Sequence, residues 1–189
     1  MMNQVASYHE LHREIIELSK TGNSRAQYQL YQLYARAMYN ICYRMMNSRE
    51  EAEDMLQESF TEAFLKLGTF RFESAFGAWL KRITVNKCIN ALKKRKADLV
   101  PVEDLPESPE EPDATPESSG LTVEQVQHAM EQLPEGYRIV FSLYLLEGYD
   151  HGEISHIMGI TEATSKSQYS RARKKIKEIL NHQSYGRQA

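Results

Sequence analysis

The chain has 189 residues, of which 41% are hydrophobic and 26% are charged, as in an ordinary soluble globular protein. No stretch approaches the roughly 20 consecutive apolar residues of a membrane span, and residues 1–10 lack the basic start and apolar run of a secretory signal. The two cysteines, Cys42 and Cys88, are too few for a disulfide framework. We therefore expect a cytoplasmic protein with reduced thiols and no contact with a membrane.

The net charge of −3 conceals an uneven distribution along the chain. Residues 81–96 and 166–177 carry only basic charges, whereas residues 98–117 between them carry only acidic ones. Either basic block alone is also typical of a solvated helix end that balances the helix dipole. The two blocks together favour two surfaces that bind a polyanion such as nucleic acid.

The first half of the chain has helical periodicity throughout. We expect helices over about 8–20 and 24–46, separated by a turn at Gly22. A third helix follows a capping box formed by Ser48 and Glu51, and it ends near Gly68. A fourth begins near Ser74 and continues into the basic block. No segment alternates with a period of two for long enough to indicate a strand.

The segment 98–120 is acidic, rich in proline and almost devoid of large apolar residues, so it predicts an extended linker. The second half predicts helices over about 122–132, 134–146, 150–158 and 162–180, with Pro134 opening the second of them. The expected fold is therefore all-α, with one helical domain over 1–97, the linker over 98–120, and a second helical domain over 121–189.

The strongest local motif is the segment from Glu153 to Thr161 and the basic helix after it. A short helix, a turn that contains glycine, a threonine N-cap and a second helix make a helix-turn-helix, whose second helix enters the major groove of DNA. Helical spacing places one set of residues inward: Ser165, Tyr169, Ala172, Ile176 and Leu180. It leaves another set largely outward: Lys166, Ser167, Gln168, Ser170, Arg171 and Lys174. An ordinary pair of helices with a solvated basic face is the alternative.

The segment from Trp79 to Lys96 forms a second candidate surface. Asn86 and Asn90 lie one turn apart, beside basic residues. Asparagine can donate to and accept from base edges, while Lys and Arg bind phosphates. The upstream rings Phe70, Phe72 and Phe76 could stack on unpaired bases, although each ring taken singly also suits a core.

A third candidate surface is the outer face of the expected helix 49–67. Its acidic residues recur with helical spacing and are interrupted by an amide and an apolar side chain; the set is Glu51, Asp54, Gln57, Glu58, Glu62 and Leu65. Such a stripe is usually just a solvated face. The interruptions also suit a surface that binds another protein.

These motifs together resemble one family. The segments 48–60, 78–86 and 90–95 resemble the second conserved region of extracytoplasmic-function (ECF) sigma factors, the group IV sigma factors, and the segments 133–135, 145–149 and 164–173 resemble the fourth. The blocks occur in order and at the family spacing. The resemblance implies a non-catalytic subunit that carries RNA polymerase to promoters and helps to open DNA.

The resemblance also implies roles for individual residues. The clamp helices of the largest polymerase subunit would be met by Asp54, Leu56, Gln57 and Glu58. The opened element near −10 would be bound by Phe72, Ser74, Phe76, Arg82, Asn86, Lys87, Asn90 and Lys93. The duplex element near −35 would be read by Thr164, Lys166, Ser167, Gln168, Ser170, Arg171, Arg173 and Lys174. An anti-sigma factor is a further partner that such factors often have.

Three residues depart from the family pattern: Ser155 replaces a usual alanine, Ser165 a usual valine and Gln168 a frequent arginine. Ser165 puts a hydroxyl on the inner face, from which we expect a less stable helix-turn-helix than most. Gln168 removes a charge from the DNA face.

Other function classes have little support. No Ser/His/Asp arrangement, paired carboxylates or glycine-rich phosphate loop stands out, and the histidines lack further ligands at metal-like spacing. We expect no catalytic residue, metal, cofactor or small-molecule substrate. Two alternatives remain: a free-standing helix-turn-helix regulator that binds duplex DNA without polymerase, and a helical adaptor that binds only proteins.

Overall fold

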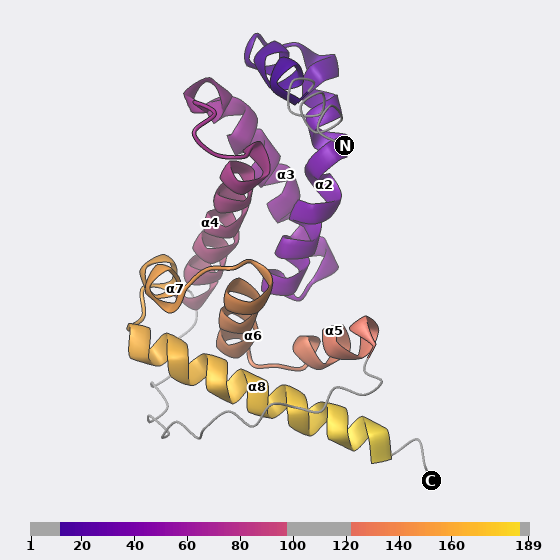
Figure 1. Ribbon diagram of the computed structural model, residues 1–189, viewed down its shortest axis with the longest axis vertical. Coiled ribbons are helices and arrows are strands. Elements are labelled where there is room, and N and C mark those ends of the chain that lie inside the picture. Colours follow the sequence, from indigo (N-terminus) through magenta and orange to yellow (C-terminus); the bar gives the residue numbers. More distant parts are fainter. Residues whose placement is uncertain (1–11, 98–121, 186–189) are drawn as a thin grey trace, which may run out of the picture. The chain divides into compact units, whose positions relative to one another are not determined.

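The computed structural model describes residues 12–97 and 122–185, and every regular element in these ranges is helical (Figure 1). The chain forms two compact units, Met1–Leu92 and Lys93–Ala189. The all-α prediction of two helical domains is confirmed. The predicted linker, 98–120, lies outside the described residues.

In the first unit, residues 12–20 are helical and precede α2 (Ser24–Met46), α3 (Arg49–Lys66) and a 3-10 turn (Leu67–Thr69). Helix α4 (Phe76–Ala97) follows, and its residues as far as Leu92 belong to this unit. The Asn23 side chain caps α2 by accepting a hydrogen bond from the Ala26 amide at 3.0 Å. The Ser48 hydroxyl caps α3 by accepting from the Glu51 amide. These caps fix where each helix begins and therefore which residues face outward.

Helices α2, α3 and α4 share one core. Leu30, Met45 and Leu80 are fully buried. The Thr84 hydroxyl of α4 lies 3.4 Å from the Met38 sulfur of α2. Cys42 and Cys88 are buried free thiols, and their mutual hydrogen bond, together with burial, raises the pKa of Cys88 far above its ordinary value. The cysteines are therefore core residues.

The second unit contains α5 (Val123–Glu131), α6 (Glu135–Phe141), the π-helical turn η2 (Ser142–Leu146), α7 (His151–Met158) and α8 (Glu162–Tyr185). The sequence predicted one regular helix over 134–146, but the structure has α-helix only to Phe141 and then a π turn. There the Glu147 amide donates to the Ser142 carbonyl, five residues back. Pro134 is the N-cap rather than the first helical residue.

The long helix α8 supports the second unit, because α5, α6 and α7 all pack on it. Ala172, Ile176 and Leu180 of α8 join a buried cluster with residues of α5 and α6, among them Met130 and Phe141. The predicted inner face of this helix is therefore confirmed.

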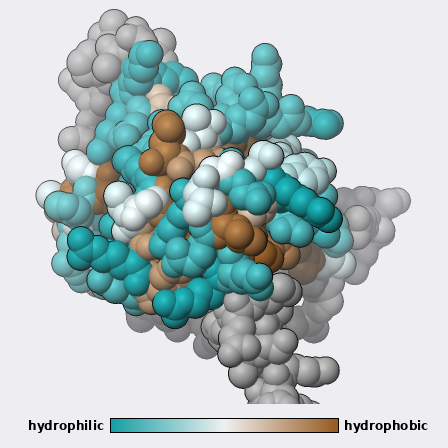
Figure 2. Space-filling model, turned by 90° about the horizontal axis from the view of Figure 1, so that it is seen from above, coloured by the Kyte–Doolittle hydropathy of each residue, from teal (hydrophilic) through white to brown (hydrophobic). Residues whose placement is uncertain are grey.

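Over the face that Figure 2 shows, hydrophobic side chains reach the surface in separate patches among hydrophilic ones.

Candidate functional site

One face of α4 presents a row of exposed polar side chains. Arg82, Asn86 and Asn90 recur every four residues and are all exposed, so they lie along one side of the helix. The opposite side carries Leu80 and Cys88, which are buried. Because the apolar side is fixed in the core, the row is held on a rigid element with its hydrogen-bonding groups available to a ligand.

The aromatic segment before α4 divides into core and surface. Phe70 and Phe76 are 4% and 5% exposed and pack against each other and Trp79. The expectation that Phe76 is open to unpaired bases is therefore wrong, because its ring is enclosed by other rings. Phe72 is half-buried, and Ser74 is exposed.

Phe72 has an unusual backbone, and charged groups surround its ring. Its φ is 61°, in the left-handed region that bulky residues rarely adopt. The Arg13 guanidinium lies 4.7 Å and the Lys20 ammonium 4.5 Å from the ring centroid. Cation–π attraction to both groups helps to hold the ring. The sequence gives no sign of this role for Arg13 and Lys20, since nothing in the pattern of 12–20 indicates a contact with residue 72.

Four residues of the acidic stripe on α3 are exposed, and Glu51 and Glu62 are half-buried. Asp54, Gln57 and Glu58 are exposed, and Leu65 is 83% exposed. Leu56, predicted to contact a protein partner, is only 8% exposed, because it lies on the inner side of α3. The expectation for Leu56 is therefore wrong as to accessibility.

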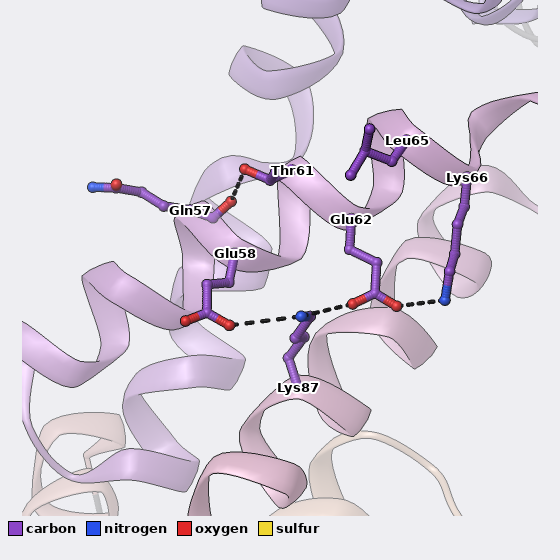
Figure 3. Close-up of a pocket in the computed structure, with 7 residues that line it drawn as sticks. All are labelled: Gln57, Glu58, Thr61, Glu62, Leu65, Lys66 and Lys87. Atoms are coloured by element: carbon purple, nitrogen blue, oxygen red, sulfur yellow. Dashed lines mark hydrogen bonds and ion pairs between the residues drawn. The ribbon is translucent and has the colours of Figure 1, made fainter.

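A shallow depression lies between α3 and α4, and charged residues line it (Figure 3). The Lys87 ammonium lies 2.8 Å from a Glu62 carboxylate oxygen and 3.6 Å from one of Glu58. Lys66 pairs with Glu62 at 2.6 Å. Hydrogen bonds from Lys66 and Lys87 lower the pKa of Glu62, and the Glu62 hydrogen bond raises that of Lys87.

This network changes the interpretation of Lys87. The sequence placed Lys87 among the DNA-binding residues, whereas its ammonium here pairs with carboxylates of the acidic stripe. Lys87 therefore ties α4 to α3 and partly neutralises the face that carries Asp54 and Glu58.

Helix α8 carries the third candidate surface. Lys166, Ser170 and Lys174 are exposed, spaced four residues apart on one side, and Thr164, Ser167, Arg171 and Arg173 are half-buried. The Glu162 carboxylate lies 2.8 Å from the Lys166 ammonium, one turn earlier. The Arg173 guanidinium lies 5.9 Å from the Tyr169 ring centroid.

Gln168 does not point outward as the spacing predicted. Its side-chain oxygen is buried without a hydrogen-bond partner, and it lies close to Gly136, where an added Cβ would be only 3.2 Å away. The side chain therefore packs toward α6. The glutamine that replaces the family's frequent arginine at this position therefore changes the charge of the DNA face less than the sequence suggested.

The turn between α7 and α8 has the geometry of a helix-turn-helix. Asp150 and Glu153 form a capping box at the start of α7. Gly159 ends that helix with a φ of 74°, which favours glycine. The Thr161 hydroxyl then accepts from the Thr164 amide at 3.0 Å and so caps α8. These local signals were all visible in the sequence, and they set the direction of α8.

An apolar surface on η2 was missed by the sequence analysis. Tyr144, Leu145 and Leu146 are 38%, 53% and 48% exposed. Three consecutive apolar residues cannot all face inward from one helix, and this was the signal in the sequence from which the surface could have been predicted.

Arg138 of α6 is buried, and it donates a hydrogen bond to the Leu133 carbonyl at 3.2 Å. Burial lowers the pKa of Arg138.

The described residues contain no group of three or more side chains suited to hold a metal ion. None of the helices in 12–97 and 122–185 has the length and hydrophobicity needed to cross a membrane.

Both units match known families. Residues 30–97 match the model of sigma-70 region 2, and residues 123–176 match that of sigma-70 region 4. An ECF RNA polymerase sigma factor SigM of Bacillus subtilis is 30% identical over 81% of this chain and 94% of its own length. The chain is an ECF sigma factor. As such it directs RNA polymerase to promoters in the initiation of transcription.

Further relatives cover both units of this sigma factor. The ECF RNA polymerase sigma-E factor of Haemophilus influenzae is 33% identical over 88% of this chain and 93% of its own length. In a solved complex of the sigma factor RpoE with the anti-sigma factor NepR from Bartonella quintana, the sigma factor is 25% identical. Its TM-score is 0.53, over 81% of this chain and 95% of that one.

Proposed function

We propose that the two units divide promoter recognition between them, with the first unit also binding core RNA polymerase. The first unit would bind the clamp helices of the largest polymerase subunit through Asp54, Gln57 and Glu58 of α3. It would hold the opened element near −10 through α4. The second unit would bind duplex DNA near −35 through α8. The predicted domains, 1–97 and 121–189, would act as separate bodies on the segment 98–120.

The exposed row on α4 is the observation that carries the role of the first unit. Arg82, Asn86 and Asn90 offer one charge and two amides in line, on a helix whose other side is fixed in the core. Amides donate to and accept from base edges, whereas a guanidinium binds phosphate. Unpaired bases expose the edges that such amides can bind. Ser74 and Phe72 extend this surface beyond the start of α4, and Lys93 extends it at the other end.

The role of the second unit is supported by the exposed cations and hydroxyls of α8. Lys166, Ser170 and Lys174 follow one side of the helix, and the Thr161 cap directs its first turn. In helix-turn-helix proteins the N-terminal residues of this helix contact base edges, and the surrounding cations bind phosphates. Thr164, Ser167, Arg171 and Arg173 complete the proposed contact set.

We also propose an assignment to group IV, a cytoplasmic location and the absence of catalytic activity. The protein would act by binding alone, without a cofactor, metal or small-molecule substrate. An anti-sigma factor would be a further partner, since the RpoE relative was solved in complex with one. The alternative of a free-standing regulator does not account for the exposed amide row of α4, since a reader of duplex DNA needs no second unit of this kind.

The test is reconstitution with core polymerase. The purified chain should co-elute with core polymerase, and the holoenzyme should start transcription at specific promoters that core alone does not use. The free chain should bind the same duplexes weakly. Tight, sequence-specific binding by the chain alone, without co-elution, would instead favour the free-standing regulator.

The polymerase-binding face can be tested within the same assay. The double substitution Asp54→Ala with Glu58→Ala should weaken co-elution with core while leaving helix content unchanged, because both side chains are exposed. Glu50→Ala with Glu53→Ala is the matched control, since it removes two exposed carboxylates from the same helix. Full activity of the Asp54 and Glu58 variant would show that the stripe is only a solvated face.

A further inference from the structure

A hydrogen bond joins the first turns of the two helices in the helix-turn-helix. Ser165, in the first turn of α8, is fully buried, and its hydroxyl oxygen lies 2.9 Å from Nδ1 of His151. His151 is the first residue of α7. The residue expected to weaken this unit, a serine on an apolar face, therefore has a partner from the neighbouring helix.

Aromatic rings fix the position of the His151 imidazole. Its ring stacks on that of Tyr144, with centroids 4.4 Å apart and planes 13° apart. The Tyr169 ring meets it edge-on at 5.8 Å. Tyr144 belongs to the π turn η2 and Tyr169 to α8, so the imidazole is held by two elements besides its own. An imidazole placed in this way has little freedom to leave the Ser165 hydroxyl.

The location of the pair determines what it can influence. Thr164 and Lys166 flank Ser165 in the sequence, and Ser167 comes next. These three neighbours belong to the proposed duplex-reading surface. A rotation of the first turn of α8 about its axis would move these three side chains together. A buried hydroxyl that loses its partner is costly, so the hydrogen bond opposes such a rotation.

We propose that His151 is a positioning residue for DNA reading: through Ser165 and the stack on Tyr144, it fixes the rotation of the first turn of α8. This inference rests on the proposed role of α8 as the duplex reader. His151 itself need not touch DNA, because it acts through the orientation of the residues on either side of Ser165.

Burial is the main reason why His151 favours its neutral form, and the charges that face it act in both directions. Asp150 precedes it at the N-cap of α7, Glu162 and Lys166 face it from α8, and the neutral rings of Tyr144 and Tyr169 cover it. Burial and the Lys166 charge lower the pKa of His151, and the two carboxylates oppose them more weakly. As the pH falls, His151 therefore binds a proton in the unfolded chain before it does so in the folded one, at about pH 6.5. The stability that neutral His151 contributes is complete above that pH and is lost as the pH falls below it.

A double-mutant cycle in the reconstituted holoenzyme tests the hydrogen bond. His151→Phe keeps an aromatic ring but leaves the Ser165 hydroxyl buried without its partner. It should weaken binding to a closed duplex promoter by about fivefold. Adding Ser165→Ala removes the stranded hydroxyl and should restore binding to within about twofold. His156→Phe, at an exposed histidine on the same helix, is the matched control and should bind as the wild type does.

A pH series separates positioning by neutral His151 from simple packing. The unfolding midpoint of the full chain should fall between about pH 7.5 and 5.5 more steeply for the wild type than for His151→Gln. His156→Gln should keep the steeper wild-type dependence. Parallel curves for the wild type and His151→Gln, or no recovery on adding Ser165→Ala, would overturn the inference.

Arg171→Ala, measured in the same binding assay, distinguishes failure of the inference about His151 from failure of the proposed function. Normal duplex binding by the Arg171→Ala holoenzyme would overturn the role of α8 itself. Weakened binding by Arg171→Ala together with normal binding by His151→Phe would overturn only the positioning role of His151.

Discussion

The helices α4 and α8 both carry basic blocks, yet the structure holds their polar groups in different ways. On α4 the exposed row contains one guanidinium and two amides, Arg82, Asn86 and Asn90, and the nearby Lys87 is paired with carboxylates of α3. On α8 the exposed row is made of two lysines and a serine, and Lys166 pairs with Glu162 of the same helix. The density of charge in the sequence therefore does not show which cations are available to DNA.

The supports of the two helices differ as well. Helix α4 shares a core with α2 and α3 that contains Leu80, two thiols and an aromatic cluster with Trp79. Helix α8 has a narrower buried face of Ala172, Ile176 and Leu180. The exposed row of α4 therefore combines two amides with a cation on a helix that packs against aromatic rings and thiols, whereas the exposed row of α8 contains no amide.

The largest expected effect comes from truncation in these two cores. Leu80→Ala and Ile176→Ala should each lower the free energy of unfolding by about 2–5 kcal/mol, since both side chains are buried. Trp79 is the only tryptophan, so its fluorescence reports on the first unit. Leu80→Ala should shift the urea transition seen by fluorescence, and Ile176→Ala should shift mainly the helical circular dichroism signal. Equal shifts of the fluorescence transition would show that the two units unfold together.

The next largest effect separates the two proposed DNA surfaces by the step of initiation that each one affects, closed-promoter binding or promoter opening. Arg171→Ala should weaken closed-promoter binding by roughly tenfold, since a bidentate base contact is worth about 1–3 kcal/mol. Asn90→Ala should leave closed binding nearly unchanged but impair opening, because its amide is expected to bind only unpaired bases. Filter binding and permanganate footprinting of each mutant holoenzyme measure the two steps.

Two exposed residues serve as controls for this experiment: Lys177→Ala on α8 and Asn40→Ala on α2. A premelted template should not fully rescue Asn90→Ala, because the base contact itself is missing. Equal loss of closed-promoter binding in Arg171→Ala and Asn90→Ala, with normal melting of the bound fraction, would contradict the proposed division of promoter recognition between the two units.

A smaller effect distinguishes two of the basic residues on α4, Arg82 and Lys87. Arg82→Gln should lower the slope of log affinity against log salt by about 1 if Arg82 binds a phosphate. Lys87→Gln should change this slope little, because its charge already pairs with Glu58 and Glu62. Binding of the two holoenzymes to a premelted promoter over a range of salt concentrations gives both slopes. Equal slopes would mean that Lys87 leaves its carboxylates and reaches a phosphate in the complex.

The smallest effect is the pH dependence of Glu62. Because Lys66 and Lys87 lower its pKa in the fold, its contribution to stability is present above about pH 4.5 and is lost as the pH falls through the lowered value. Glu62→Gln should therefore be less stable than the wild type at neutral pH by about 0.2–1 kcal/mol. The difference should vanish in acid. Urea titrations at several pH values measure it, and a constant difference would point to a cause other than ionisation.

The sequence by itself determined the helical class, the two domains and most helix ends, because these depend on local signals. Ser48, Gly159 and Thr161 act on backbone groups within a few residues, and the apolar spacing of α8 defines its buried face without reference to any neighbour. The outward direction of Asn86, Asn90 and Asp54 followed from the same periodicity.

Only the tertiary structure decided which of these residues have partners, since contacts between helices depend on their packing. It enclosed Phe76 among other rings, turned Gln168 toward Gly136 and paired Lys87 with two carboxylates of α3. It also joined Ser165 to His151, fourteen residues away and on another helix. A periodicity specifies the direction of a side chain from its own helix axis, but the group that it meets there is set by the packing of the next helix.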